Sequence, residues 1–309
     1  MYNEEVKNRY FDEVLSGSDS NTRSIFNFIG DFEENLQIDF AVMSEVDRIE
    51  YIETRCYTDA SKLRSDISAM NRYIEWYRKT FSITQPPYRK DWLCIEKYDF
   101  GAGMEGHILG SESEFLSILR NVCPLDAGYE CVAGLCLAWL GLSKKEAVEL
   151  LEDEIDFGNR AIVHKNKIIA SNISPEILEI LKSYSITNEA QRTQNQTYTV
   201  YADRDGKHFL HRMISKGSNQ AGKPFTAIRL TASINWLQEQ TEKDVSYGNV
   251  FRSGCLWRIY QLDQSGYNLY RRSNATHVKA VYRAQNKGLT ASDILLMYEC
   301  YKKRFHPED

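Results

Sequence analysis

The 309-residue sequence lacks the features that mark membrane, secreted and zinc-binding proteins. It contains no run of 18 apolar residues, so we expect no membrane span and no membrane partner. The polar, charged stretch Met1 to Arg9 does not have the pattern of a secretory signal. Its seven cysteines are odd in number and include no close pair at zinc-ligand spacing. We therefore expect reduced thiols, a cytoplasmic location, no metal and no other cofactor.

The sequence also lacks the net positive charge that is typical of nucleic-acid binders, because its formal net charge is −5. The charges are, however, distributed unevenly. Acidic side chains concentrate between residues 4 and 53, whereas basic side chains concentrate between residues 204 and 287. A basic C-terminal half can hold phosphates even when the whole chain is mildly acidic. The alternative interpretation is an ordinary solvated surface.

Helical spacing of apolar residues predicts an all-helical N-terminal region. Three successive stretches carry an apolar face: Ile25, Ile29, Phe32 and Leu36; Val46, Ile49 and Ile52; and Leu63, Ile67, Met70, Ile74 and Tyr77. The opposite face of the third stretch is polar and basic, with Lys62, Ser65, Arg72 and Lys79. Gln85-Pro86-Pro87 and the charged residues after it predict a linker. We therefore expect a helical domain over residues 1–84, a linker over 85–91 and a second domain over 92–309.

The second domain begins with helices and then changes to short β-type runs. We expect helices over residues 113–122, 129–140 and 144–151, and a helix opened by Ser174 and Pro175. Ser143 could cap the helix that follows it, with Glu146 completing a capping box. Residues 161–163 and 168–170 predict a β-hairpin with lysines at its tip, and residues 187–197 predict a polar loop. The predicted class is therefore α+β, mainly α with a small β-hairpin or sheet.

Three segments resemble the tyrosine recombinases, the family of the phage integrases. The helices from Asn21-Thr22-Arg23 to Trp76 resemble the family's helical core-binding (SAM-like) domain, which clamps one face of the DNA duplex. The segment Leu137 to Ala147, which contains Gly141-Leu142-Ser143-Lys144-Lys145-Glu146, is similar to the family's T-G-L-R-x-x-E segment. Asn249-Val250-Phe251-Arg252 is similar to the family's H-x-x-R motif. The resemblance implies a two-domain architecture, double-stranded DNA as partner and strand cleavage through a 3′-phosphotyrosine.

The catalytic positions that this resemblance implies are only partly kept. Active members grip the scissile phosphate with two arginines, and they use a lysine, two histidine-type residues and a nucleophilic tyrosine. Ser143 stands at the first arginine, Asn249 at the first histidine, and Arg272 or Ser273 where an L-G-H segment is expected. Arg252 matches the second arginine, Lys167 the lysine with Lys165 as a rival, and Tyr282 is the best candidate nucleophile. We therefore expect the site to be vestigial, with no active catalytic residue.

Each candidate residue also has an ordinary structural interpretation. Arg252 could be a surface salt-bridge partner, Tyr282 a packing residue, and the hairpin lysines solvated charges. Asn249 could read a base edge or, more simply, cap a helix. The candidate DNA contacts are cations of both predicted domains: Lys62, Arg64, Arg72, Lys165, Lys167, Arg252, Arg271 and Arg272. A solvated helix face is the alternative for the first three of them.

Three functions are open at this point. In the first, the chain is a sequence-specific DNA-binding regulator with an inactive site, which resembles the recombinase-like repressors of SPbeta-type phages. That resemblance implies transcriptional repression, maintenance of lysogeny, the cytoplasm of a bacterial host cell as location, and release by a phage anti-repressor. In the second, the chain is a diverged but active integrase, and in the third a helical interaction protein without a DNA role. The C-terminal stretch 291–305 could pack on its own chain or exchange between protomers of a homo-oligomer.

Overall fold

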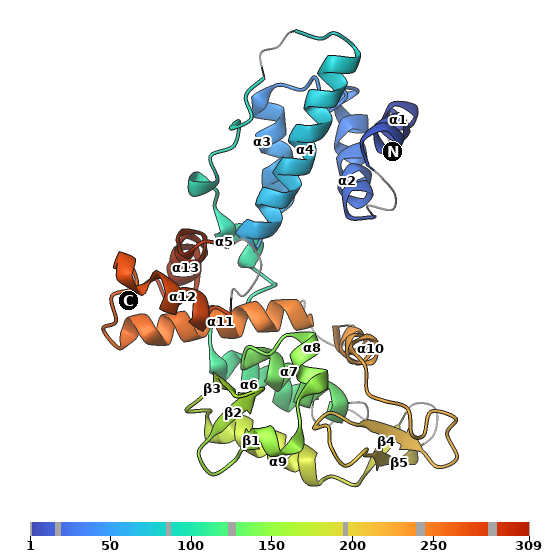
Figure 1. The fold of residues 1–309 in the computed structure, drawn as a ribbon, viewed down its shortest axis with the longest axis vertical. Helices are drawn as coiled ribbons and strands as arrows, with labels where there is room; N and C mark the ends of the chain where they lie inside the picture. Colours follow the sequence, from blue (N-terminus) through green and yellow to red (C-terminus); the bar gives the residue numbers. More distant parts are fainter. Residues whose placement is uncertain are drawn as a thin grey trace. The chain divides into compact units, whose positions relative to one another are not determined.

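The computed structural model describes residues 2–15, 20–84, 88–122, 128–193, 197–238, 245–283 and 289–308. The chain divides into two units, Met1–Met104 with Asn286–Cys300, and Glu105–Gln285 with Tyr301–Asp309. Helices predominate, and the strands form two small antiparallel sheets (Figure 1). The predicted class, mainly α with a small β content, is confirmed. No helix in the described part of the chain is both long and apolar enough to cross a membrane.

The described residues of the first unit form helices joined by loops and contain no strand. Its helices are α1 (Glu4–Val14), α2 (Ser20–Leu36), α3 (Glu45–Thr54), α4 (Ala60–Thr80), η1 (Ile95–Lys97), α5 (Phe100–Met104) and the first part of α13 (Ala291–Phe305). The predicted apolar face of α4 is confirmed, because Leu63, Ile67, Met70 and Ile74 are buried. The predicted face of α3 is wrong at Val46, which is 72% exposed. Arg48 and Tyr51 occupy the buried face of α3 instead.

The division into units differs from the predicted domain boundary. The first unit runs to Met104 and so includes the predicted linker, of which residues 85–87 lie outside the described residues. Asn71 holds the described part of this segment against α4: its amide donates to the Lys90 carbonyl at 3.0 Å and its oxygen accepts from the Trp92 indole at 2.8 Å. These contacts join the described part of the predicted linker to the first unit, and the predicted domain boundaries stay a prediction.

The second unit combines helices with both sheets. Its helices are α6 (Glu112–Val122), α7 (Gly128–Trp139), α8 (Lys144–Glu149), η2 (Glu152–Glu154), α9 (Pro175–Ile186), α10 (Ala227–Gln238), α11 (Tyr247–Gln264), η3 (Arg272–Asn274), α12 (Ala275–Val281) and residues 301–305 of α13. The first sheet contains β1 (Ile155–Asp156), β2 (Ala161–His164) and β3 (Lys167–Ala170), and the second contains β4 (Glu189–Thr193), β5 (Thr197–Asp203) and β6 (Arg212–Ser215). The predicted helices over 113–122, 129–140 and 144–151 and the predicted hairpin are confirmed.

The second sheet corrects the prediction of a polar loop over residues 187–197. Residues Glu189–Thr193 form β4, which pairs antiparallel with β5, and β5 pairs with β6. Only a small apolar cluster supports this sheet, with Ala190, Val200 and Met213 buried. Most other side chains of these strands are polar, so the sequence lacks the apolar alternation that indicates a strand.

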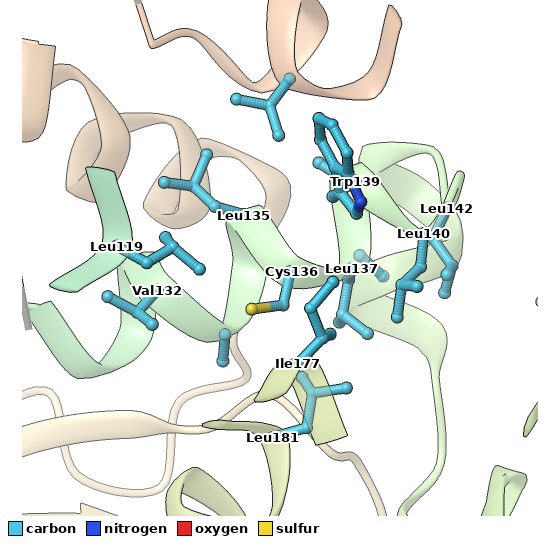
Figure 2. Packing of buried hydrophobic residues seen from close by; sticks show 14 of the residues in the cluster. Leu119, Val132, Leu135, Cys136, Leu137, Trp139, Leu140, Leu142, Ile177 and Leu181 are labelled. Carbon is cyan, nitrogen blue, oxygen red and sulfur yellow. The ribbon is translucent and has the colours of Figure 1, made fainter. Parts of the chain in front are cut away.

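Helix α7 forms the centre of the second unit. Beyond Glu130 in its first turn it is almost entirely apolar, and Cys131, Leu135, Cys136 and Ala138 are fully buried. Figure 2 shows its side chains packed beside Ile177 and Leu181 of α9. Gly141 ends the helix with a φ of 91°, and Leu142 N–H returns to the Leu137 carbonyl at 3.0 Å. This is a Schellman ending, in which a left-handed residue suits glycine.

Helix α11 approaches the end of α7 closely at Gly254. A Cβ atom at this position would lie 2.0 Å from the Trp139 carbonyl oxygen and 2.7 Å from its carbon. Both atoms are backbone, so neither can move aside as a flexible side chain could. The contact therefore requires glycine at position 254.

Gly254→Ala should destabilise the protein by at least about 2 kcal/mol, because the added methyl group must separate two packed helices. Gly248→Ala, in the same helix, is the control, since its Cβ would have no neighbour closer than 3.8 Å. The control should change stability by less than about 1 kcal/mol. Urea unfolding monitored by circular dichroism measures both, and equal stabilities would contradict the close approach.

Candidate nucleic-acid interface

Ser143 takes part in a local helix cap. Its hydroxyl accepts from Glu146 N–H at 3.3 Å, and its own N–H donates to the Glu146 carboxylate at 2.8 Å. Both halves of the predicted capping box are thus present at the start of α8. The Schellman turn at Gly141 places Ser143 directly beyond the end of α7. The residue at the position of the family's first arginine therefore stabilises its own helix.

Arg283 reaches the same turn from the other end of the unit. Its Nε donates to the Gly141 carbonyl at 3.0 Å, and its guanidinium also donates to the Glu146 carboxylate at 2.6 Å. Burial alone would raise the pKa of Glu146, but the bonds from Ser143 and Arg283 outweigh it and hold that pKa below its ordinary value. The sequence did not identify Arg283 as a residue of this site, because its contacts with Gly141 and Glu146 join positions far apart in the chain. Its one sequence signal is that it directly follows Tyr282.

A second arginine completes the end of α7. Arg258 donates to the Trp139 carbonyl at 2.5 Å and to the Cys255 sulfur at 3.2 Å. The carbonyls at the end of a helix lack partners within the helix and carry partial negative charge, so guanidinium groups stabilise them. A Cβ at Gly141 would lie 2.6 Å from the Arg258 guanidinium. A side chain at position 141 would therefore displace the Arg258 guanidinium, and the positive φ of 91° favours glycine in any case.

Asn249 and Arg252 lie in the first turns of α11. The prediction that Asn249 caps a helix is wrong, because Ser246 is the N-cap and accepts from Asn249 N–H at 3.2 Å. The Asn249 side chain is buried, and its oxygen accepts from the Arg252 guanidinium at 2.5 Å. Asn249 therefore helps to orient the arginine that matches the family's second arginine.

The β2–β3 hairpin separates the two lysine candidates. Lys165 and Asn166 form its turn, both with positive φ, and Lys167 begins β3. The Lys165 ammonium donates to the Glu149 carboxylate at 2.5 Å, a bond that lowers the pKa of Glu149. Its backbone N–H donates to Glu154 at 2.9 Å. Lys167 is exposed, and among the described residues no carboxylate lies within 4.0 Å of its ammonium, so it is the freer of the two to bind phosphate.

The candidate residues between positions 271 and 282 differ in exposure. Tyr282 is 3% exposed at the end of α12, as its packing interpretation predicts. Ser273 lies in the exposed turn η3, where its hydroxyl donates to the Asn274 side chain at 3.4 Å. Arg271 and Arg272 are exposed in the same loop. Their proposed role as DNA contacts stays a prediction, as it does for the other candidate cations.

In the first unit, the remaining candidate cations lie on α4 and differ in whether they form ion pairs. Lys62 donates to the buried Asp66 carboxylate at 2.6 Å. Arg64 donates to the buried carboxylate of Asp293 in α13 at 2.5 Å, whereas Arg72 is exposed.

The contact of Arg64 belongs to the packing of α13 against its own chain. Ile294, Met297 and Tyr298 of this helix are fully buried. In the described monomer, α13 therefore contacts its own chain, and exchange between protomers stays a prediction.

Comparison with known proteins gives structural likeness only. No family model and no curated protein matches the sequence. Solved structures to which the chain is similar include an integrase and a recombinase. The Tn1549 transposon integrase in complex with transposon right end DNA has a TM-score of 0.47 at 12% identity, over 96% of this chain and 93% of that one. The XerA recombinase has a TM-score of 0.39 at 14% identity, over 96% and 93%. Because both TM-scores are below 0.5, these likenesses do not indicate a function. Any functional inference must come from the residues of this chain.

Ser143→Ala should lower the free energy of unfolding by about 1 kcal/mol, because it removes the cap of α8. Ser143→Thr keeps a hydroxyl and should retain most of that stability. Thermal and urea unfolding of both variants measure the difference. If the alanine variant is as stable as the wild type, the capping box does not explain why serine occupies this position.

Proposed function

We propose that this chain is a sequence-specific double-stranded DNA-binding protein of tyrosine-recombinase type that holds DNA without recombining it. The carrying observation is that Ser143, at the position of a phosphate-binding arginine, caps α8 and shares Glu146 with Arg283. In the same proposal, the protein is a phage transcriptional repressor that maintains lysogeny and is released by an anti-repressor.

The site lacks the groups that phosphoryl transfer needs. Negative charge builds on the phosphoryl oxygens during cleavage, and fixed cationic donors stabilise it. Serine is neutral and too short for a bidentate grip on phosphate. Asn249 cannot exchange a proton near neutral pH, and its oxygen already accepts from Arg252. Tyr282 is buried, so its hydroxyl is poorly placed to attack a bound backbone.

The groups that binding needs are better preserved. Arg252 is oriented by Asn249 at the start of α11, and Lys167 is exposed on the hairpin. Arg271 and Arg272 are exposed before α12. Cations of this kind bind phosphates by releasing counterions, which requires no catalytic geometry. Loss of cleavage is therefore compatible with retention of DNA binding.

Arg252→Ala should weaken binding to every DNA sequence and reduce the slope of log affinity against log salt by about one. Arg252→Lys keeps the charge and should preserve most of the slope. Gel shifts at graded salt on source-genome fragments measure both. An unchanged slope in the alanine variant removes Arg252 from the phosphate contacts, and a wild type that binds no DNA at low salt favours a helical interaction protein.

A nicked suicide duplex that traps phosphotyrosine should give no covalent adduct with the wild-type protein, because Ser143 and Asn249 replace catalytic groups. Denaturing gel electrophoresis measures the adduct. An adduct that forms with the wild type and disappears in Tyr282→Phe would overturn the inactive-site proposal and favour a diverged integrase.

Genome-wide capture of bound DNA then shows where the binding sites lie. Sites at promoters are expected for a repressor, and sites at an attachment site for an integrase.

A further inference from the structure

A polar cavity of about 430 Å³ lies between β6, the loop after it and the first turns of α10. Its polar lining consists of Arg212, Ser215, Ser218, Gln220, Thr226 and Arg229. Neither Ser143, Asn249, Arg252 nor Tyr282 lines it, so it is distinct from the vestigial site. Two arginines and three hydroxyls in one cavity form an unusual concentration of hydrogen-bond donors.

Arg212 is held in place by neutral acceptors. Its Nε and one terminal nitrogen donate to the Pro224 carbonyl at 3.3 and 3.0 Å, and the other terminal nitrogen donates to the Gln220 side chain at 2.9 Å. Its cross-strand neighbour Asp203 accepts instead from Gly222 N–H at 2.9 Å. Within the described parts of the chain, no carboxylate lies within 4.0 Å of the Arg212 guanidinium. Its positive charge is therefore oriented without being neutralised by an ion pair.

Arg229 is oriented by a carboxylate below the cavity. Its Nε and a terminal nitrogen donate to Glu130 at 3.1 and 3.0 Å. Glu130 is 1% exposed and also accepts from Met213 N–H at 2.6 Å and from the Ser233 hydroxyl at 3.2 Å. This carboxylate balances one arginine and fixes its position, so the two arginines and Glu130 together keep one positive charge.

Two of the three hydroxyls of the lining, those of Ser218 and Thr226, accept hydrogen bonds from backbone N–H groups. Ser218 accepts from Gln220 N–H at 3.2 Å, and Thr226 accepts from Arg229 N–H at 3.2 Å. Each hydroxyl oxygen is thus already an acceptor from backbone, which leaves its proton to donate elsewhere. Lys216 and Lys223 are exposed on the same loop and add positive charge beside the cavity.

We propose that this cavity binds a phosphate ester. A tetrahedral oxyanion matches an arginine whose charge is not paired, a second fixed arginine and hydroxyl donors. If the phosphate belongs to the DNA backbone, the inference rests on the proposed DNA-binding function and adds a contact outside the recombinase-type site. If it belongs to a free compound, the cavity is an independent ligand site. The phosphate chemistry is shared, and experiment separates the sources.

The first arm measures DNA affinity of the full chain by gel shift at graded salt. Arg212→Ala should weaken binding roughly tenfold and reduce the salt slope by about one. Ile228→Glu places a carboxylate at the cavity, and because Ile228 is 84% exposed the substitution should not disturb folding. It should weaken binding at least as much. Lys182→Ala, which removes an exposed charge outside the cavity, should stay within about twofold of the wild type.

The second arm omits DNA and titrates the same proteins with pyrophosphate, with chloride at equal ionic strength as reference. A free-phosphate site predicts a pyrophosphate-dependent rise in unfolding temperature that Arg212→Ala and Ile228→Glu both abolish. An effect of these two variants on DNA alone assigns the cavity to the backbone, and an effect on pyrophosphate alone assigns it to a free compound.

Wild-type behaviour of both variants in both arms overturns the proposal while leaving DNA binding intact. Failure of the wild type itself to shift DNA defeats the proposed function instead, and the pyrophosphate arm then decides the cavity by itself.

Discussion

The close contact between α11 and the C-terminal end of α7 is the constraint on which the second unit depends. Gly254 allows the helices to meet backbone to backbone at Trp139. Arg258 and Arg283 then donate to the carbonyls of Trp139 and Gly141, which the helix itself leaves without partners. This arrangement fixes the turn that carries Ser143. The geometry of the turn around Ser143 is therefore set by helix packing and helix capping.

Local signals in the sequence were enough to predict the helices, the hairpin and the cap at Ser143. Apolar periodicity identified α4 and α7, and a serine followed three residues later by glutamate identified the capping box. Signals that depend on partners distant in sequence were insufficient. Glu189–Thr193 has no apolar alternation, and its strand forms because β5 supplies the backbone partners. Arg283 was missed for the same reason, since nothing near it in the sequence indicates Glu146.

In the candidate site, too, the sequence identified residues but not their contacts. The family resemblance identified Ser143, Asn249 and Arg252 as positions that matter, but it could not predict what each contacts. Asn249 lies within α11 because Ser246 takes the cap, and its amide accepts from Arg252. Lys165 and Lys167 lie two residues apart on the hairpin but differ in their ion pairing, because the Lys165 ammonium donates to the Glu149 carboxylate. Charge and spacing in the sequence identify candidate binding residues. The hydrogen-bond and ion-pair partners in the folded chain determine which of their charges can bind a ligand.

The contact of Arg283 with Glu146 links the cap at Ser143 to the position of Tyr282. In this chain Glu146 is shared between the cap of α8 and a guanidinium that directly follows the candidate nucleophile. An arginine at position 143 would lose the hydroxyl that caps α8, and it would not release the buried tyrosine. The cap of α8 and the ion pair of Arg283 therefore share one carboxylate, so serine at position 143 is supported by several contacts at the end of α7. In the proposed function, these contacts stabilise the turn while the cations that face solvent bind phosphate.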